Sequence, residues 1–411
     1  MNNKQLSKLV VAFLAVAVIG WILVQKRNQS WSQGEASIGG QVMPEFPLNE
    51  VEKLSIQDAN GEVTLLKTEE TWKVEQRGSY AADFAKIRDL LIQVSEVKTL
   101  RPMQVGESQL GRLELLEPGS GDKAGTLLTF TGKEDKILGK LLLGKQSMKK
   151  SESSSFGGGE FPDGRYLMAD GDINRISQVS EAFSSVNTEA SQWLDKTFFK
   201  VEKLKSISLT HPESTNSWHV TRESDTADMV LAGLAEGEEL DSSRSYSLKN
   251  VLSSPSFNDV VGPDTNLDDL GLDAPIAAEL ETFDGFSYAI KLGKPNADEE
   301  YPMQVSVSAS IAAERVPEEN EKEEDKEKLD QEHAERVAEL NKKLESEQAL
   351  DGVVFWVSKW TVDTLLKNRS ELLKQPEEAD ASGAESDGLD VPSVDLPGID
   401  SLTNPLGLGE Q

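Results

Sequence analysis

Residues 198–210, FFKVEKLKSISLT, decide how this chain is organised, because they repeat the pattern of residues 46–57, FPLNEVEKLSIQ. The likeness continues downstream, where TWKVEQ at 71–76 has a counterpart in SWHVTR at 217–222. The order of the elements is kept, so the chain contains an internal duplication. A period of roughly 150 to 170 residues is far longer than the 20 to 50 residues of stacked solenoid units. Each copy is therefore expected to be a domain with its own core.

The first copy, residues 46–197, has the pattern of an α+β domain. Asn60 and Gly61 predict a tight turn between two strands, and Thr71 to Val74 predict a third short strand. Asp83 can begin a helix that presents an apolar stripe at helical spacing. The residues of this stripe are Phe84, Ile87, Leu90, Leu91 and Val94. Further strands are expected at 127–131, 136–143 and 165–169, and a closing helix at 173–183.

The second copy, residues 198–375, repeats this order. Strands are predicted at 201–210, 218–221, 277–283, 286–292 and 353–357, the last matching 165–169 of the first copy. YSLKNVLSSPSF at 246–257 predicts a helix with Leu248, Val251 and Leu252 facing inward. Val362, Leu365 and Leu366 mark a closing helix. Trp72 and Trp218 are expected to occupy equivalent places and to fill the two cores. The predicted fold is α+β, with two tandem, mostly antiparallel sheets that each carry helices on one face.

Two segments stand apart from the duplication. The second copy contains an insertion at about 312–349, rich in Glu and Lys at helical spacing, with Val337, Leu340 and Leu344 as its apolar stripe. This pattern predicts a solvated charged helix, and a docking arm for a partner is the alternative. Residues 376–411 form an acidic tail that is expected to be disordered.

The N-terminal residues 1–27 are predicted to anchor the chain in a membrane. Sixteen residues without a charge, LVVAFLAVAVIGWILV at 9–24, are flanked by Lys4 and Lys8 on one side and by Lys26 and Arg27 on the other. A span needs about 17 residues at the low end, and snorkelling lysines can supply the difference. A polar linker at 28–45 follows.

A cleaved signal peptide is the alternative for this stretch, but QKRNQSW at 25–31 lacks the small residues that precede a cleavage site. The basic residues are balanced across the apolar stretch, so charge favours only slightly a cytoplasmic N-terminus. We expect a single-pass membrane protein whose main body lies outside the cytoplasm.

The overall charge argues against nucleic acid as a partner. The chain has 42 Lys and Arg against 72 Asp and Glu, which gives a net charge of −30 at pH 7. Such a surface repels phosphate backbones. The chain also lacks cysteine, which excludes disulfides, thiolate catalysis and thiolate metal sites.

The sequence predicts no catalytic, cofactor or metal site. His211, His219 and His333 are far apart and show no metal-binding spacing. DTNLDDLG at 264–271 resembles the start of a calcium loop, but Asp269 replaces the required glycine and Pro275 the final glutamate. FGGGEF at 156–161 lacks the lysine of a phosphate loop.

NLDDLGLDAPIAAELE at 266–281, followed by YAIKLGK at 288–294, resembles the bacterial family named domain of unknown function 4340. The residues that match its pattern are Gly271, Leu272, Asp273, Pro275, Leu292, Gly293, Tyr301, Phe355, Val357 and Leu365. In the first copy, LGRLELLEPG at 110–119 keeps only Leu116 and Pro118. The resemblance covers about residues 46–373.

The resemblance implies an accessory protein that is associated with ABC transport systems of the gliding-motility type. It would be anchored in the bacterial inner membrane by one N-terminal helix, with its main body periplasmic or otherwise extracytoplasmic. From this and the lack of catalytic groups, we expect a non-catalytic scaffold of the cell envelope whose partners are permease or ATPase subunits or other envelope proteins. The alternative is a module that binds a small molecule or glycan between the two copies, because domain interfaces often form pockets. The oligomeric state is left open.

Overall fold

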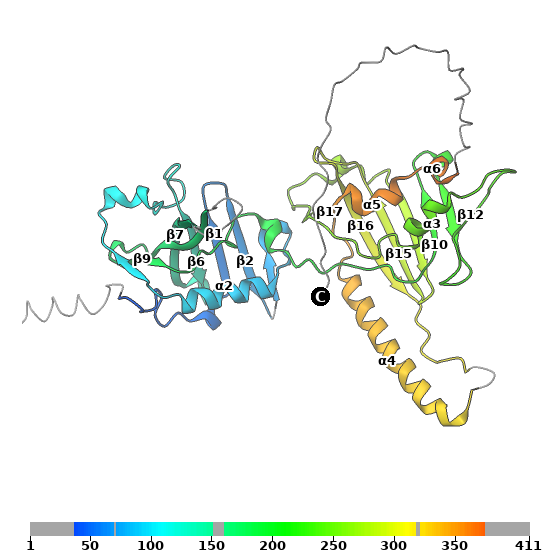
Figure 1. Cartoon of the computed structure of the whole chain (residues 1–411), viewed down its shortest axis with the longest axis horizontal. Coiled ribbons are helices and arrows are strands. Elements are labelled where there is room, and N and C mark those ends of the chain that lie inside the picture. Colours follow the sequence, from blue (N-terminus) through cyan, green and yellow to red (C-terminus); the bar gives the residue numbers. More distant parts are fainter. Residues whose placement is uncertain (1–36, 70, 151–159, 318–320, 375–411) are drawn as a thin grey trace, which may run out of the picture.

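Two antiparallel sheets, one for each repeat, form the body of the protein (Figure 1). The computed structural model describes residues 37–69, 71–150, 160–317 and 321–374. The anchor expected at 1–27 and the tail at 376–411 lie outside the described residues. Within the described part of the chain, no helix has the length and apolar character needed to cross a membrane.

The first repeat is built on a nine-stranded sheet whose strand pairings are all antiparallel. Its order is β4-β3-β2-β1-β6-β7-β8-β9-β5. The strands are β1 (Lys53–Gln57), β2 (Glu62–Thr68), β3 (Thr71–Val74), β4 (Tyr80–Ala81), β5 (Arg101–Met103), β6 (Thr126–Thr131), β7 (Ile137–Lys150), β8 (Glu160–Ala169) and β9 (Ile176–Val179). The turn predicted at 60–61 joins β1 to β2, and the strands predicted at 127–131 and 136–143 pair as β6 and β7.

One helix, α2 (Phe84–Glu96), covers a face of this sheet (Figure 1). Asp83 caps it, as predicted, by accepting a hydrogen bond from the Lys86 amide. The predicted apolar stripe is buried from Ile87 onward. Phe84 is an exception, because it is the first residue of the helix and remains 55% exposed.

The closing helix predicted at 173–183 is wrong. Ile173–Arg175 form a single 3-10 turn, and strand β9 follows directly. Ile173, Ile176 and Val179 have the three-residue spacing of a helix. However, β9 lies between β5 and β8, where Ile176 and Val179 are buried. A strand covered on both faces loses the alternation that would distinguish it from a helix.

The second repeat is built on an eight-stranded antiparallel sheet in the order β12-β11-β10-β14-β15-β16-β17-β13. Its strands are β10 (Leu204–Thr210), β11 (Trp218–Thr221), β12 (Val230–Leu231), β13 (Asp259–Val260), β14 (Ile276–Thr282), β15 (Phe286–Leu292), β16 (Glu300–Ala309) and β17 (Phe355–Ser358). The strands predicted at 277–283 and 286–292 pair as β14 and β15 across Asp284 and Gly285.

The sheet orders correct two equivalences drawn from the sequence. The strand at 353–357 was matched to 165–169, but β16 occupies the place of β8, and β17 that of β9. Trp72 lies two strands from β1, whereas Trp218 lies on the strand directly beside β10. Both rings are 4% exposed, so both fill cores as predicted, but from different positions.

Short helices cover one face of the second sheet (Figure 1). They are α3 (Ser242–Lys249), α5 (Lys359–Leu366) and α6 (Arg369–Leu372). The helix predicted at 246–257 therefore ends at Lys249, and Val251 and Leu252 are buried in the loop beyond it. Leu252 has a positive φ of 53°, which a helix does not allow.

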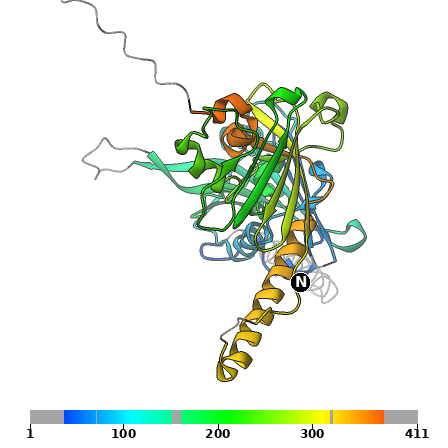
Figure 2. The same ribbon diagram turned by 90° about the vertical axis from the view of Figure 1, so that its right-hand side faces the viewer.

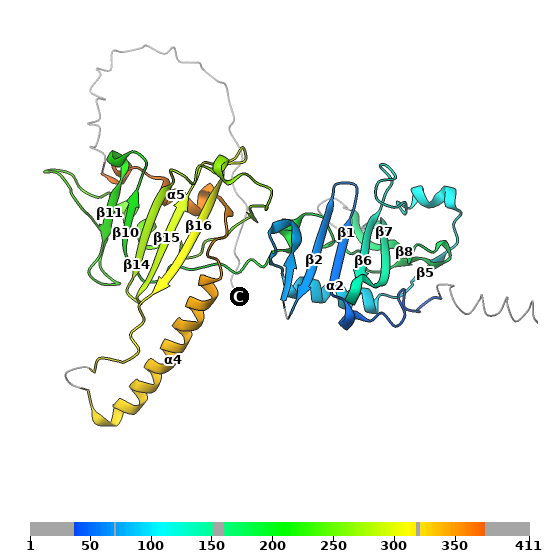
Figure 3. The same ribbon diagram turned by 180° about the vertical axis from the view of Figure 1, so that it is seen from behind.

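The charged insertion forms α4 (Glu323–Gln348), as predicted. This helix projects from the second sheet as an arm (Figures 2 and 3). At its base, Leu340 and Leu344 pack against the core. The stripe noted in the sequence thus attaches the arm to the body.

The packed part of the first repeat begins before residue 46. Val42 and Met43, in the expected linker at 28–45, are each 5% exposed. The Val42 amide donates to the carbonyl of Val97, which ties this segment to the end of α2.

Candidate functional site

A cleft of about 740 Å3 lies where the two repeats meet. The first repeat contributes residues of β3 and β4, and the second contributes β13 and the loop that follows it. The end of α4 and the loop after it supply a third wall, through Ser346, Ala349 and Leu350. Much of the lining is apolar, including Val260, Val261 and Val353. A mostly apolar hollow between two domains is typical of a ligand pocket.

The two sheets reach the cleft by their edges. β4 is the outermost strand of the first sheet and β13 that of the second. The chain segment that connects the repeats covers β4: the Asp195 amide donates to the Ala81 carbonyl, and Leu194 pairs with Ala82. The backbone of this edge is thereby satisfied, which limits its pairing with other strands.

An ion pair joins the repeats across the junction. The Arg77 guanidinium donates two hydrogen bonds of 2.7 Å to the carboxylate of Asp259. Both side chains are about three-quarters buried, at 25% and 24% exposure. Because the ion pair is bidentate, it fixes the relative orientation of the two side chains as well as their distance. This pair therefore restrains how the first repeat is oriented on β13.

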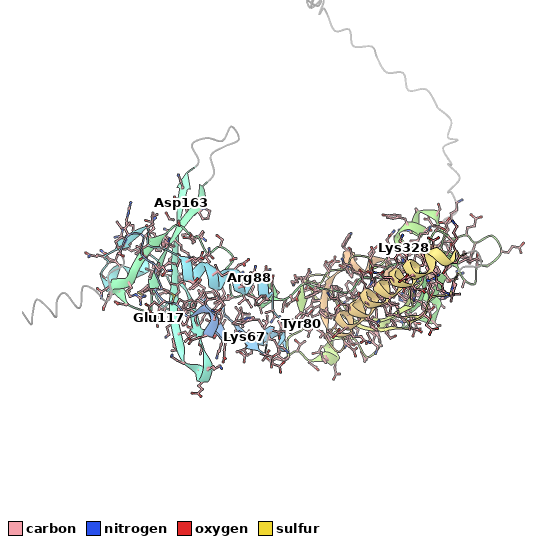
Figure 4. All side chains as sticks on the ribbon, turned by 90° about the horizontal axis from the view of Figure 1, so that it is seen from below. Lys67, Tyr80, Arg88, Glu117, Asp163 and Lys328 are labelled. Carbon is pink, nitrogen blue, oxygen red and sulfur yellow. The ribbon has the colours of Figure 1, made fainter. Side chains whose placement is uncertain are left out.

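An aromatic cluster also joins the two repeats. The Tyr80 ring packs edge-on against Phe257 and Phe355, with centroids 5.9 and 5.8 Å apart. Phe198, the first residue of the second repeat, packs against Phe199 and the same two rings. Tyr80 belongs to the first repeat and lies at the junction in Figure 4. The cluster gives the two repeats a shared apolar contact.

Burial shifts the pKa of two groups at the junction. Burial and then the negative charge of Asp195 raise the pKa of Tyr80 to about 12. Burial lowers the pKa of Lys196, whose ammonium group donates to the Asn258 carbonyl and lies over the Phe257 ring. Near neutral pH the phenol is uncharged, so the cleft presents a neutral aromatic wall beside basic groups.

Lys73 also lines the cleft, and it has no ion-pair partner among the described residues. The arrangement can accept an apolar group against the valines and place an anionic group near Lys73. The signal for this site in the sequence is weak, because its residues come from five separate stretches.

A buried carboxylate attaches the arm to the second repeat. Glu347, 5% exposed, accepts a hydrogen bond of 2.9 Å from the Lys200 amide. The Tyr288 hydroxyl lies 3.0 Å from Glu347 Oε2 and 2.9 Å from the Lys200 carbonyl. Burial raises the pKa of Glu347, against the opposing effects of the Lys200 amide and Lys343. The sequence does not distinguish Glu347 as a buried residue, because it is one of many glutamates in the insertion.

The three histidines are not brought together. His211 Nε2 lies 3.2 Å from the Lys367 carbonyl, and His219 Nδ1 lies 2.8 Å from the Ser208 hydroxyl. His333 contacts the Ala312 carbonyl on the arm. Each histidine therefore has a local partner in its own part of the second repeat.

The calcium-like loop has a structural use. Asn266 caps the 3-10 helix Leu267–Leu270 by accepting from the Asp268 amide, and its side-chain amide donates to Asp269. No group of three or more His, Asp or Glu side chains suited to a metal ion occurs among the described residues. Most of FGGGEF lies outside the described residues.

Residues 72–275 match the model of a protein family described as domain of unknown function (DUF4340). The match supports assignment to the DUF4340 family. It runs from β3 to the residue before β14 and so crosses the junction and its cleft. Of the residues that carry the resemblance, Gly271, Leu272, Asp273 and Pro275 lie within the matched segment. Leu292 and all the later ones lie beyond its end. Comparison with curated proteins and with solved structures gave no match.

Proposed function

We propose that this chain is a membrane-anchored, non-catalytic accessory or scaffold protein of the cell envelope, associated with an ABC-type transport system. The proposal places the body outside the cytoplasm and the anchor, residues 1–27, in the inner membrane. It rests on the apolar N-terminal stretch, the DUF4340 match and the organisation of the body.

The observation that carries the proposal is the α4 arm. It is a 26-residue helix that projects from the second sheet. Its base is fixed by Glu347 and by Lys343, whose ammonium group donates to the Lys200 carbonyl and to Glu202. Near its tip, Arg315 pairs with Glu321 and Asp330. A helix held at both ends offers a partner a surface that needs little ordering on binding.

Affinity purification from the native membrane tests this function. The full chain, solubilised in mild detergent, should recover permease and ATPase subunits, identified by mass spectrometry. The variant Glu335→Lys/Glu339→Lys, which reverses two exposed charges on α4, should reduce that recovery. Matched reversals on α2, Asp89→Lys/Glu96→Lys, should leave it unchanged. Recovery of no transporter subunit in several detergents would contradict the proposal.

A ligand-binding module is the second candidate, and the junction cleft is the observation that favours it. The mixture of valines with Lys73 suits a small apolar anion. A fluorescent naphthalene sulfonate is a suitable probe, since its emission rises in apolar pockets. Val353→Trp should fill the cleft and reduce binding of the probe, whereas Val316→Trp, at an exposed site outside it, should not. Equal binding by all three proteins would exclude the cleft as a site.

A further inference from the structure

A second hollow lies on the helical face of the second repeat, away from the junction cleft. It has a volume of about 670 Å3 and is lined by α3, α5 and the loop that follows α3. We call it the α3–α5 groove. Tyr246 and Trp360 both line it, and their side chains are 78% and 81% exposed.

Such exposure distinguishes Trp360 from the tryptophans of the two cores. Trp72, Trp193 and Trp218 are at most 4% exposed. Large aromatic rings contribute most to stability when buried, so two exposed rings at one groove need an explanation other than folding. Exposed Trp and Tyr are enriched where a protein binds something else.

The charges at the groove are already neutralised within the protein. Lys359 lies 3.6 Å from Glu299, and Asp363 lies 2.8 Å from Lys367. A charged ligand would compete with these pairs. The net charge of −30 adds a general repulsion for anions such as nucleic acid. The groove therefore suits a neutral ligand.

The lining also contains several hydroxyl groups and one side-chain amide, that of Asn250. Asn250 donates through its amide nitrogen to the Tyr246 carbonyl, which leaves the Asn250 side-chain oxygen available as an acceptor. The hydroxyls of Ser253, Ser254 and Thr364 make no hydrogen bond within the described part of the chain. A purely apolar ligand would leave these groups without partners, which costs free energy.

The groove is held in shape from below. Val251 and Leu252 line its floor and are buried in the core. Asp241 caps α3, and the Ser358 hydroxyl caps α5 by accepting from the Thr361 amide. Rigid walls reduce the ordering cost that binding would otherwise carry.

We propose that the α3–α5 groove binds a neutral oligosaccharide. The C–H face of a pyranose ring stacks on the negatively polarised face of an aromatic ring, as Trp360 and Tyr246 provide. Sugar hydroxyls exchange hydrogen bonds with Asn250, Ser253 and Thr364. The proposal is independent of the transporter association and of the junction cleft.

Titration of the full chain in detergent with two neutral probes tests the proposal. The probes are the hexamers of β-1,4-linked glucose and of β-1,4-linked N-acetylglucosamine, followed by calorimetry. At least one should bind the wild type, and Trp360→Ala and Tyr246→Ala should each weaken that binding by about tenfold or more. Phe84→Ala removes an exposed ring from α2 and should have no effect.

Circular dichroism and thermal unfolding of the variants show whether the fold is retained. The substituted rings are exposed, so both variants should fold normally. The proposal is wrong if neither hexamer binds, or if binding survives both substitutions. Loss of a co-purified envelope protein in Trp360→Ala, with no sugar binding, would identify the groove as a protein-docking surface instead.

Discussion

At the scale of single residues, the marks that carry the family resemblance have structural roles. Gly271 ends the 3-10 helix Leu267–Leu270 with a positive φ of 69°. Gly293 lies where a Cβ atom would be 2.1 Å from the Leu270 carbonyl oxygen. The two glycines thus allow this turn to pack against the end of β15. A motif of this kind reports the fold and leaves the activity open.

Gly293→Ala should therefore be strongly destabilising. The added methyl group meets backbone, so relief requires the turn or β15 to move. We expect the free energy of unfolding of the second repeat to fall by about 2–3 kcal/mol. Gly262→Ala is the matched control, since its nearest atom would be 3.5 Å away. Equal urea midpoints for the two variants would show that the turn adapts without strain.

Glu347 makes stability depend on pH. Its pKa in the folded protein is raised above the ordinary value of 4.5, chiefly by burial. The folded state then binds the proton more tightly than the unfolded state. The contribution of Glu347 to the free energy of unfolding is therefore fully present below its unfolded pKa of about 4.5. It is lost as the pH rises through the higher pKa of the folded state. Tyr288, Lys343 and Glu202 face this carboxyl group and also affect its pKa.

Glu347→Gln should remove this dependence. The amide can accept from the Lys200 N–H and donate to the Tyr288 hydroxyl, which in turn donates to the Lys200 carbonyl. Relative to the variant, wild type should lose stability as the pH rises from 4.5 through the raised pKa of Glu347 in the folded protein. Urea unfolding across that range measures the difference. Parallel curves for wild type and Glu347→Gln would rule out this role, and Glu345→Gln, at an exposed neighbour, serves as control.

At the scale of elements, the sequence was informative where one face of an element is solvated. The α2 stripe and the alternation in β15 predict their structures, because each presents a polar face to water. β9 and the 3-10 turn before it lack this contrast between a buried and a solvated face, so the sequence does not distinguish them from a helix. The match of 353–357 to 165–169 is wrong because the corresponding place in the second sheet is held by β16, which the sequence analysis does not predict as a strand.

The candidate sites were harder to predict than the elements. The junction cleft combines β3, β4, β13 and the end of α4, which only the folded chain brings together. Arg77 and Asp259 are 182 residues apart in sequence. Tyr246 falls within the helix predicted at 246–257, and Trp360 precedes the residues that mark the closing helix. Nothing in the local pattern indicates that both rings stay exposed.

The cap of α2 gives a prediction at this scale. Asp83 Oδ1 accepts from the Lys86 amide at 3.0 Å and satisfies one of the free donors at the start of the helix. Asp83→Ala should lower the free energy of unfolding of the first repeat by about 1 kcal/mol. Asp89→Ala, on the exposed face of the same helix, should change it by less than about 0.5 kcal/mol. Thermal or urea unfolding distinguishes the two, and equal effects would contradict the capping role.

At the scale of the whole molecule, the central question is how firmly the repeats are joined. The aromatic cluster around Tyr80 supplies apolar contact, and the Arg77–Asp259 pair supplies direction. Apolar contact tolerates sliding, whereas a two-pronged ion pair does not. The pair is only partly buried, so its free energy is modest, about 1 kcal/mol. We therefore expect it to act on orientation more than on stability.

The absence of cysteine makes this testable, because labels can be placed without a background. Spin labels at Lys67→Cys and Lys291→Cys, both at exposed positions, report the distance between the repeats. Arg77→Ala and Asp259→Ala should each broaden the distance distribution measured by pulsed electron resonance. The combined variant should be no broader than either single variant, because both remove the same interaction.

A matched control is Arg88→Ala, which removes an exposed pair with Asp89 within α2. It should leave the distribution unchanged. If all variants give the wild-type distribution, the aromatic cluster alone fixes the junction, and the cleft has a constant shape. If the two single variants broaden it and the combined variant broadens it further, Arg77 and Asp259 act through different partners. Only equal broadening identifies their pair as the restraint that sets the width of the cleft.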